Sequence, residues 1–354
     1  MNKPIIVFFS GRATYEVDGK EINSDGIGWL RGIAFQSAKE WLGRHFRYLE
    51  PSNSQHVMLD PIFMQTKGGS RELKGTVETI KSNDTSVGSG YYPLSPLEQI
   101  VLEVRHHLNS DEFLRQHKHL GEDVKVMGVR RSQNISLTIG ISFIDKELGD
   151  ARSYFDLKHQ LEDELLKYVR GFIEKKEMNI RLNKKDLWIN ALDDEVEALK
   201  RKKQQEDHCY LTVLGTSAEH GDDGAVGRGN RVNGVSPYYK PVSLEAASGK
   251  NPVSHVGKLY NVLAFLAAKR VYEQFEPKLQ ETYVKLVSRI GAPIGDPALS
   301  ALLYVADQSL SIQEQKLAEK ILKEELAYHL ANGKLRDEIV RGDYDHGSLL
   351  YLLE

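Results

Sequence analysis

The chain has 354 residues, of which 27% are charged and 40% hydrophobic, and its formal net charge at pH 7 is −3. This length predicts a substantial core divided into two or three lobes. The near balance of charge excludes a surface that binds nucleic acid or a membrane through bulk charge, and no apolar run reaches the ~20 residues of a transmembrane helix. The single cysteine, Cys209, excludes an internal disulfide framework and a cysteine-rich zinc site. With no secretory signal at Met1, we expect a soluble, cytoplasmic protein.

The N-terminal part of the chain predicts a strand, a hairpin, a helix and a long loop. The apolar run from Pro4 to Phe9 predicts the strand, and the turn at Asp18-Gly19 predicts the hairpin. A helix is expected from about Ile27 to Phe46, where apolar residues recur on one face. Residues 61–93 are rich in Gly, Ser, Thr and Asn. Such long loops in compact proteins often carry function.

Residues 94–214 predict a ββαββ domain. Alternation and helical periodicity indicate an α+β fold in which a long helix packs on a largely antiparallel sheet. The charge-dense segment 183–208 interrupts this domain and predicts a solvated helical protrusion. The expected elements are a first helix at 97–109, strands at 124–129 and 135–144, the long helix at 154–172, and strands at 180–182 and 210–214.

Residues 215–332 predict a third region, followed by a tail at 333–354. Strands are expected at 283–290 and 302–305. Ser311 with Glu314 forms a capping-box pattern that predicts the start of a helix ending near Ala331.

The segment from Gly215 to Lys258 contains the strongest functional signal, because its first half has the composition of a polyphosphate-binding loop. Glycines surround Asp222 and Asp223, and Arg228 and Arg231 follow them. Glycine lets a backbone approach an anion closely, arginine forks match phosphate oxygens, and carboxylates can hold Mg²⁺ or a ligand ammonium. An ordinary glycine-rich surface loop is the alternative for this half alone. The glycines are Gly221, Gly224, Gly227 and Gly229.

The second half places Ser248 and Lys250 just before Asn251-Pro252, which predict the N-cap and first residue of a helix. Lys250 would then lie at a helix N-terminus, where free N–H groups and the helix dipole favour an anion. His255 and Lys258 would extend this positive end from the first two turns. A capped core helix without a ligand is the alternative. Neither half matches the GxxxxGK[ST] or GxGxxG phosphate motifs.

Two long motifs, GTSAEHGDDGAVGRGNRVNG and EAASGKNPVSHVGKLYN, closely resemble those of the archaeal-type S-adenosylmethionine synthetases (methionine adenosyltransferases). Shorter segments agree in the same order, namely SGRAT, NDTSVGSGYYPLS, LNSDEF and GEDVKVMG. The similarity covers most of residues 5–293. It implies an α+β fold of repeated sheet-plus-helix domains, in which residues 1–93 form an incomplete lobe with a long active-site loop.

The resemblance implies an enzyme in which the sulfur of methionine attacks C5′ of ATP and expels tripolyphosphate, which is then hydrolysed to pyrophosphate and phosphate. Positioning and stabilisation of the leaving group by Lys, Arg and Mg²⁺ should dominate catalysis. Mg²⁺ and K⁺ are the implied cofactors. The implied catalytic residues are Lys125, Arg228 and Lys250.

The resemblance also assigns roles to individual side chains. Lys125 would contact polyphosphate with Asp123 as its partner, since the two lie two residues apart on one face of a strand. Without the family, an exposed strand ion pair is the simpler interpretation. Asp84 would contact the adenosine or methionine side, and Asp222, ahead of Asp223, would bind the methionine ammonium or a metal ion. His255 would add positive charge to the phosphate site. The remaining implied substrate-binding positions are Gly224, Gly227, Arg231, Ser248 and Lys258.

The chain departs from the family in one respect: members carry an N-terminal segment with a GHPD motif, and no His-Pro-Asp occurs in this sequence. Three interpretations follow. A separate small protein supplies the segment, the chain is a non-catalytic subunit that binds nucleotide or S-adenosylmethionine, or the reading frame is incomplete. We favour the first because the other motifs are intact. The chain alone should then be inactive and expose an apolar edge. The implied assembly is a homodimer, or a heterotetramer with the small protein.

Overall fold

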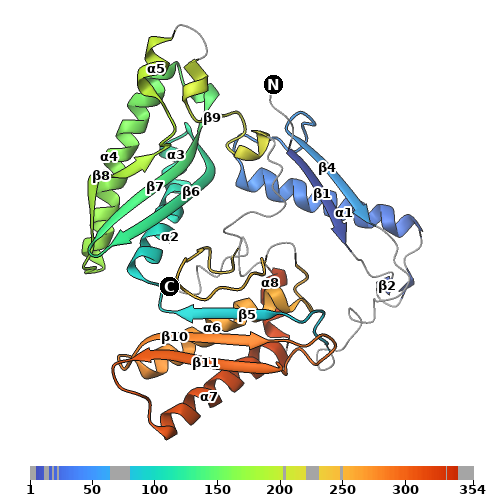
Figure 1. Cartoon of the computed structure of the whole chain (residues 1–354). Helices are drawn as coiled ribbons and strands as arrows, with labels where there is room; N and C mark the ends of the chain where they lie inside the picture. Colours follow the sequence, from blue (N-terminus) through green and yellow to red (C-terminus); the bar gives the residue numbers. More distant parts are fainter. Residues whose placement is uncertain are drawn as a thin grey trace. The chain divides into compact units, whose positions relative to one another are not determined.

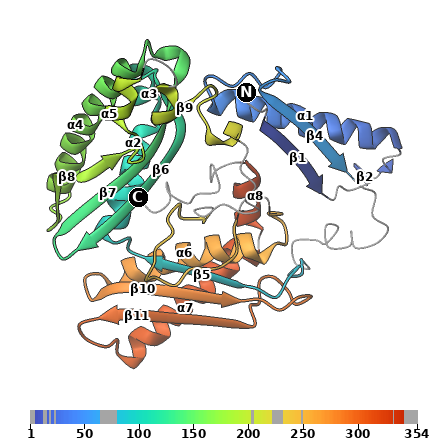
Figure 2. The ribbon, with the colours of Figure 1, turned by 45° about the horizontal axis from the view of Figure 1, so that its top comes forward.

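The computed structural model forms two compact units. Unit 1 comprises Met1–Thr66 and Pro96–Gly224, and unit 2 comprises Lys67–Ser95 and Ala225–Glu354. In each unit helices cover one face of a sheet (Figure 1, Figure 2), which confirms the predicted α+β class. No helix within the described ranges is long and apolar enough to cross a membrane. The described residues are 5–11, 16–17, 20–21, 24–63, 80–201, 205–220, 231–247, 250–331 and 333–341.

The main sheet of unit 1 is mixed. Strands β6 (Leu120–Arg131) and β7 (Asn134–Ile144) form the predicted antiparallel pair, but β8 (Arg181–Ile189) and β9 (Leu211–Thr212) both run parallel to β7. The prediction of a largely antiparallel sheet is therefore wrong for this unit. The reason is the long helix α4 (Ala151–Lys175), which carries the chain back along the sheet as a crossover between β7 and β8.

Helices α2 (Pro96–Leu108) and α4 cover one face of this sheet. The long helix α4 begins at a capping box, in which the Asp150 side chain accepts from the Ser153 N–H and the Ser153 hydroxyl accepts from the Asp150 N–H. The predicted helix α4 is confirmed, and so is its apolar face. A short helix that was not predicted, α3 (Asp111–Gln116), follows α2. The buried residues of the α4 face include Tyr154, Leu161, Leu165 and Val169.

The charged segment after Leu182 is only partly a protrusion. It was expected to leave the sheet at Asn183, but strand β8 continues to Ile189. Helix α5 (Glu195–Lys200) follows and buries Ala198 fully in the core, so part of the segment contributes to packing.

The N-terminal part of unit 1 is a separate, smaller layer. Strand β1 (Ile5–Gly11) pairs in parallel with β4 (Val57–Phe63), and helix α1 (Ser24–His45) lies between them in sequence. The predicted hairpin is confirmed as β2 (Glu16–Val17) and β3 (Lys20–Glu21).

Unit 2 contains a three-stranded antiparallel sheet. Its central strand β10 (Leu279–Val287) pairs with β11 (Leu299–Ala306) on one side and β5 (Val87–Tyr92) on the other. Strands β10 and β11 were predicted, whereas β5 lies within the stretch expected to be irregular. The Gly-Ser-Gly sequence in the middle of β5 has low strand propensity, so the sequence alone does not predict this strand.

The glycines of β5 are required by helix α6 (Val256–Phe275), which lies directly on the strand. A Cβ on Gly90 would lie 2.2 Å from the backbone nitrogen of Phe265, and a Cβ on Gly88 would lie 2.5 Å from the backbone of Tyr260. The helix is buried on most of its circumference, including the fully buried Tyr260 and Leu263. The start of α6 is thus held firmly by the sheet.

The C-terminal helices complete unit 2. Helix α7 (Ile312–Leu326) begins at the predicted Ser311–Glu314 capping box, and its last turn continues as a π-helical turn, Ala327–Ala331. The chain then forms α8 (Lys334–Arg341), which was expected only as a tail. Its Leu335 is fully buried in the core of unit 2. The predicted division into three lobes and a tail stays a prediction.

Candidate functional site

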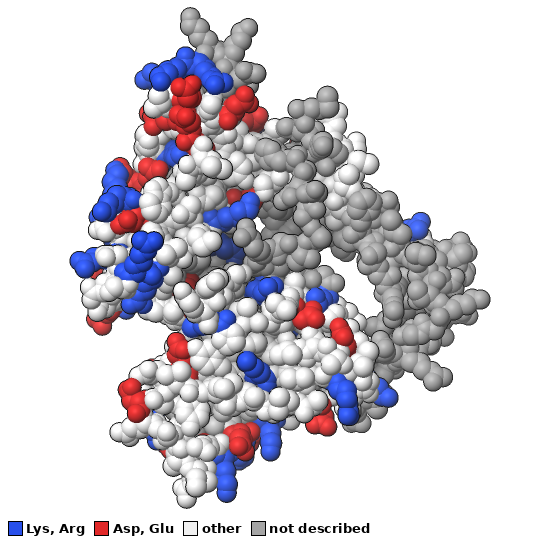
Figure 3. All heavy atoms as spheres, in the orientation of Figure 1, with Lys and Arg blue, Asp and Glu red and all other residues white. Residues whose placement is uncertain are grey.

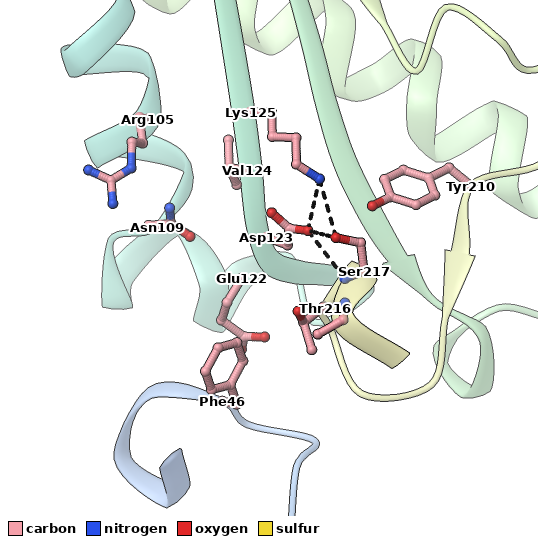
Figure 4. A pocket seen from close by; sticks show the side chains of 11 residues that line it. Phe46, Arg105, Asn109, Glu122, Asp123, Val124, Lys125, Tyr210, Thr216 and Ser217 are labelled. Atoms are coloured by element: carbon pink, nitrogen blue, oxygen red, sulfur yellow. Dashed lines mark hydrogen bonds and ion pairs between the residues drawn. The ribbon is translucent and has the colours of Figure 1, made fainter. Parts of the chain in front are cut away.

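Unit 1 contains a cavity of about 1040 Å³ bordered by β6, the end of α2 and residues 210–218. Figure 4 shows the Lys125 ammonium and Ser217 turned toward the carboxylate of Asp123, with Arg105 and Tyr210 on either side. The cavity therefore brings together the two residues predicted from GEDVKVMG and a third, Ser217, from the start of the GTSAEHGDDG motif.

Asp123 is the centre of this group. Its Oδ2 accepts from Lys125 Nζ at 3.1 Å and from the Ser217 N–H at 3.2 Å, and it also accepts from the Ser217 hydroxyl. Burial alone would raise the pKa of Asp123, but the Ser217 hydrogen bonds and the Lys125 charge together lower it below its ordinary value. The carboxylate is thus ionised at neutral pH and holds the largely exposed Lys125 in place. The sequence predicted the Asp123–Lys125 pair but not Ser217.

Glu122, also in GEDVKVMG, makes a second polar group at the cavity. Its Oε1 accepts from Arg47 Nε at 2.7 Å and from the Arg47 backbone N–H at 3.2 Å. Arg47 also donates to the backbone oxygen of Leu114 at 2.8 Å. Glu122 Oε2 and Asn109 Oδ1 are buried and have no hydrogen-bond partner among the described residues. Two acceptor atoms of residues that line the cavity are therefore left unpaired in the described part of the chain.

A buried network supports one wall of the cavity. The backbone N–H of Tyr210 donates to the Tyr154 hydroxyl at 3.2 Å, and that hydroxyl donates to Asp193 at 2.6 Å. Lys158 Nζ lies 2.8 Å from the same carboxylate. Asn190, whose φ is +44°, donates to the Tyr154 hydroxyl and to the backbone of β7. These contacts connect the position of Tyr210 to α4 and to the end of β8.

Unit 2 contains the second candidate site, at the start of α6. The prediction that Asn251 caps this helix is wrong, because α6 begins at Val256 with His255 as the N-cap. The His255 Nδ1 accepts from the Gly257 N–H at 3.2 Å. Asn251 instead caps the preceding turn, where its Oδ1 accepts from the Val253 N–H at 2.7 Å. The imidazole is therefore part of the helix end, and Lys250 lies in the turn before it.

Three basic side chains gather at this helix end, namely Lys250, His255 and Lys258. Burial lowers the pKa of Lys258, and the neighbouring Lys250 lowers it further. Burial and Lys250 also lower the pKa of His255. The Lys258 ammonium has no hydrogen bond or ion pair with any other described residue. Basic side chains held close together in excess over carboxylates favour an anionic ligand.

One carboxylate, Glu245, lies within this basic group. Its Oε2 is 3.0 Å from Lys250 Nζ, and its Oε1 accepts from the Ser86 hydroxyl at 2.9 Å. The hydrogen bond from Lys250 lowers the pKa of Glu245, and the one from Ser86 adds to this. Asp84 is near enough to act on the charge of His255, and its own Oδ1 accepts from the Thr85 N–H. The sequence predicted Asp84 but missed Glu245, although it begins the EAASGK motif.

Charges of both signs are mixed on the visible surface of the described residues (Figure 3). On the face of the molecule seen in Figure 3, Lys and Arg are interspersed with Asp and Glu over the described parts of both units. No broad positive patch is seen among the described residues on this face.

Several predicted positions lie outside the described residues, namely Asp222, Asp223, Gly224, Gly227, Arg228 and Ser248. Arg231 is described, and its buried Nε has no hydrogen-bond partner among the described residues. Within the same ranges no group of three His, Cys, Asp or Glu side chains is arranged to hold a metal ion. Mg²⁺ at Asp222 and Asp223 stays a prediction.

Comparison with known proteins gives a consistent result. A family profile described as S-adenosylmethionine synthetase (AdoMet synthetase) matches residues 1–343. The S-adenosylmethionine synthase of Pyrobaculum aerophilum is 40% identical over 348 residues, which cover 96% of this chain and 79% of that protein. A probable S-adenosylmethionine synthase of Aquifex aeolicus is 38% identical over 332 residues, covering 91% and 75%. The solved structure of an unusual S-adenosylmethionine synthetase from Campylobacter jejuni is similar in fold, with a TM-score of 0.50 at 12% identity over 99% of this chain and 88% of that one.

Proposed function

Since this chain belongs to the S-adenosylmethionine synthetase family, we propose that it forms S-adenosylmethionine from ATP and L-methionine, with phosphate and pyrophosphate as the other products. The observation that carries the proposal is the pair Lys250 and Lys258 at the start of α6: burial and the neighbouring Lys250 lower the pKa of Lys258, and only Lys250 has a carboxylate partner, Glu245, among the described residues. Such a group suits a polyphosphate, which brings several negative charges at once.

The reaction needs stabilisation of its leaving group. The methionine sulfur forms a bond to C5′ of ATP, the C5′–O bond breaks, and its electron pair leaves with the tripolyphosphate. Lys250 and Lys258 would bind this leaving group, and the imidazole of His255 lies beside them. Lys125, oriented by Asp123, would bind polyphosphate in the cavity of unit 1. These side chains act by position and charge rather than by covalent chemistry.

The positions outside the described residues complete the proposed site. Arg228 and Ser248 would extend the phosphate contacts, and Gly224 and Gly227 would let the backbone approach the ligand. Asp222 and Asp223 would hold the methionine ammonium or Mg²⁺. Mg²⁺ and K⁺ are the expected cofactors, and a cytoplasmic location is expected from the single cysteine.

We further propose that a separate polypeptide with a GHPD motif completes the enzyme. No His-Pro-Asp occurs in the sequence, and the chain spans 79% of the length of the Pyrobaculum aerophilum protein. Large apolar side chains also lie open on the small N-terminal layer: Trp29 and Trp41 on α1 are 54% and 43% exposed, and Ile6 and Met58 on the strands are 53% and 50% exposed. A complementary polypeptide would bury these groups.

A complementation assay tests both proposals. The purified chain is assayed with ATP, methionine, Mg²⁺ and K⁺, alone and with an added GHPD polypeptide. Synthesis is expected only with the polypeptide, and Lys250→Ala should abolish it, whereas the exposed control Lys320→Ala on α7 should not. Synthesis by the chain alone would overturn the need for a partner. Binding of ATP by the pair without any turnover would favour the non-catalytic alternative.

The apolar faces of the sheets support a homodimer as part of this proposal. In β6, Gly128 faces α2, so Met127 lies on the open face of the sheet and is 61% exposed. Trp188 of β8 lies in the same row, since both residues flank Thr138 of β7. Light scattering should give the mass of a dimer, or of a heterotetramer with the GHPD polypeptide. Met127→Glu should lower that mass, and a monomeric wild-type chain would contradict the proposal.

A further inference from the structure

We propose that Glu245 is an internal counter-ion of Lys250 that competes with polyphosphate and so weakens its retention by the enzyme. The inference rests on the proposed polyphosphate site at the start of α6. It assigns to Glu245 a role opposite to that of the basic residues around it, namely to keep the site from binding its anionic product too tightly.

The Glu245 carboxylate is held in the site by specific contacts. Its two oxygens have separate partners: Oε2 is 3.0 Å from Lys250 Nζ, and Oε1 accepts from Ser86 at 2.9 Å. The Ser86 backbone N–H in turn donates to the Ser288 hydroxyl at 2.8 Å, which fixes Ser86 against the end of β10. Both side chains of the pair are largely buried, with 20% of Lys250 and 28% of Glu245 exposed.

Gly257 makes room for the pair. A Cβ at this position would lie 3.0 Å from Glu245 Oε2 and 3.0 Å from Lys250 Cε. The carboxylate and the ammonium therefore rest against the first turn of α6, where helix N–H groups favour an anion. In the ligand-free chain the anion at this helix end is Glu245 itself.

A polyphosphate that binds Lys250 must share the lysine with Glu245 or displace it. Sharing brings two anions together in a partly buried place, which is unfavourable because their repulsion is poorly screened there. Displacement costs the hydrogen bonds of Glu245 to Lys250 and Ser86. In either case Glu245 lowers the affinity for polyphosphate. If Glu245 served only to orient Lys250, its removal would lower that affinity instead, so the two roles predict opposite signs.

Titration of the full chain with inorganic tripolyphosphate distinguishes the two roles. Glu245→Gln removes the charge at nearly constant shape and should tighten tripolyphosphate binding by about tenfold, the effect of losing one competing charged hydrogen bond. Ser86→Ala removes one hydrogen-bond partner of the Glu245 carboxylate. It should also tighten tripolyphosphate binding, by a smaller factor than Glu245→Gln does. Glu273→Gln makes the same change of net charge near the other end of α6 and should leave the affinity unchanged.

Thermal unfolding gives a second readout that a purely structural role would not produce. Glu245→Gln should lower the melting temperature of the ligand-free chain, because the contacts with Lys250 and Ser86 are lost, yet increase the rise in melting temperature caused by tripolyphosphate. Unchanged or weaker binding by Glu245→Gln would overturn the counter-ion role. Undiminished binding by Lys250→Ala would instead overturn the polyphosphate site itself, so the two failures are distinguishable.

Discussion

Ser217 donates two hydrogen bonds to one oxygen of Asp123, one from its backbone N–H and one from its hydroxyl, although 94 positions separate the two residues. The first bond is 3.2 Å long. Lys125 donates to the same Asp123 oxygen at 3.1 Å and to the Ser217 hydroxyl at 3.3 Å. Asp123 therefore does two things: it joins the segment after β9 to strand β6, and it sets the direction of the Lys125 ammonium.

Replacing Asp123 by Asn should impair the reaction more than the fold. The amide cannot carry the negative charge that holds Lys125, and charged hydrogen bonds contribute about 2 kcal/mol, so kcat/KM for ATP should fall by about thirtyfold. The measurement is steady-state kinetics of the reconstituted enzyme. Asp163→Asn is the matched control, since it breaks an exposed ion pair with Lys184. Equal kinetic loss in both variants would contradict the assignment.

Lys258→Met should weaken ligand binding and stabilise the free chain at the same time. The substitution removes a partly buried cation whose pKa is lowered by burial and by Lys250. We expect about tenfold weaker binding of tripolyphosphate, together with a higher melting temperature without ligand. Lys269→Met, which removes a lysine near Glu273 on the same helix, should not weaken binding. A fall in both quantities for Lys258→Met would show that the lysine has a structural role instead.

Two glycine substitutions should have opposite effects on stability. Gly90→Ala forces a methyl group to within 2.2 Å of the α6 backbone, so it should destabilise unit 2 by about 3 kcal/mol or more. Gly171→Ala, within α4, meets nothing within 4 Å and should stabilise unit 1 by about 1 kcal/mol through helix propensity. Urea unfolding of each variant measures both effects. A tolerated Gly90→Ala would contradict the close packing of α6 on β5.

His119 should make stability depend on pH. Burial, with a further contribution from His117, lowers the pKa of His119 from 6.5 to about 4. Its buried Nε2 has no partner among the described residues. Between these two pH values the unfolded chain binds more protons than the folded one, so the free energy of unfolding should fall as pH is lowered from 6.5 toward 4 and level off below.

The matching variant is His119→Gln, which cannot take up the proton. Urea unfolding at pH 7 and pH 5 should show a smaller difference for His119→Gln than for the wild type. The same difference in both proteins would assign the pH dependence to other groups, such as the half-buried His107, whose pKa burial also lowers.

The sequence predicted those elements whose signal is local. The amphipathic helix α4 repeats its apolar residues over many turns, and the Ser311–Glu314 box needs only four consecutive residues. Strand β5 was missed because its glycines are needed for the close approach of a helix more than 160 positions later in the chain. Gly90, for example, packs against the backbone of Phe265. The parallel pairing of β8 with β7 was missed for a related reason, since alternation within a strand does not identify its neighbour.

In the candidate site, too, the sequence predicted the residues with a local signal and missed those that depend on distant contacts. Asp123 and Lys125 were predicted to lie on one face because they are two positions apart on a strand, and the structure pairs them. Ser217 was missed because its partner Asp123 is 94 positions away. Glu245 was missed because Ser86, which holds its second oxygen, is 159 positions away. His255 was expected inside the helix, yet its imidazole accepts from the Gly257 N–H and ends the helix there. Such capping by histidine has no strong sequence signal.

The backbone N–H of Tyr210, in one wall of the unit 1 cavity, donates to the hydroxyl of the core residue Tyr154. This part of the wall should therefore open to solvent only as often as the core around Tyr154 does. Tyr154 is 1% exposed and also bonds Asp193 and Asn190, so the Tyr210 amide can exchange with solvent only when α4 and the end of β8 separate. Hydrogen exchange at Tyr210 should therefore be as slow as in the strands. Ligand entry at this cavity has to proceed without opening that wall.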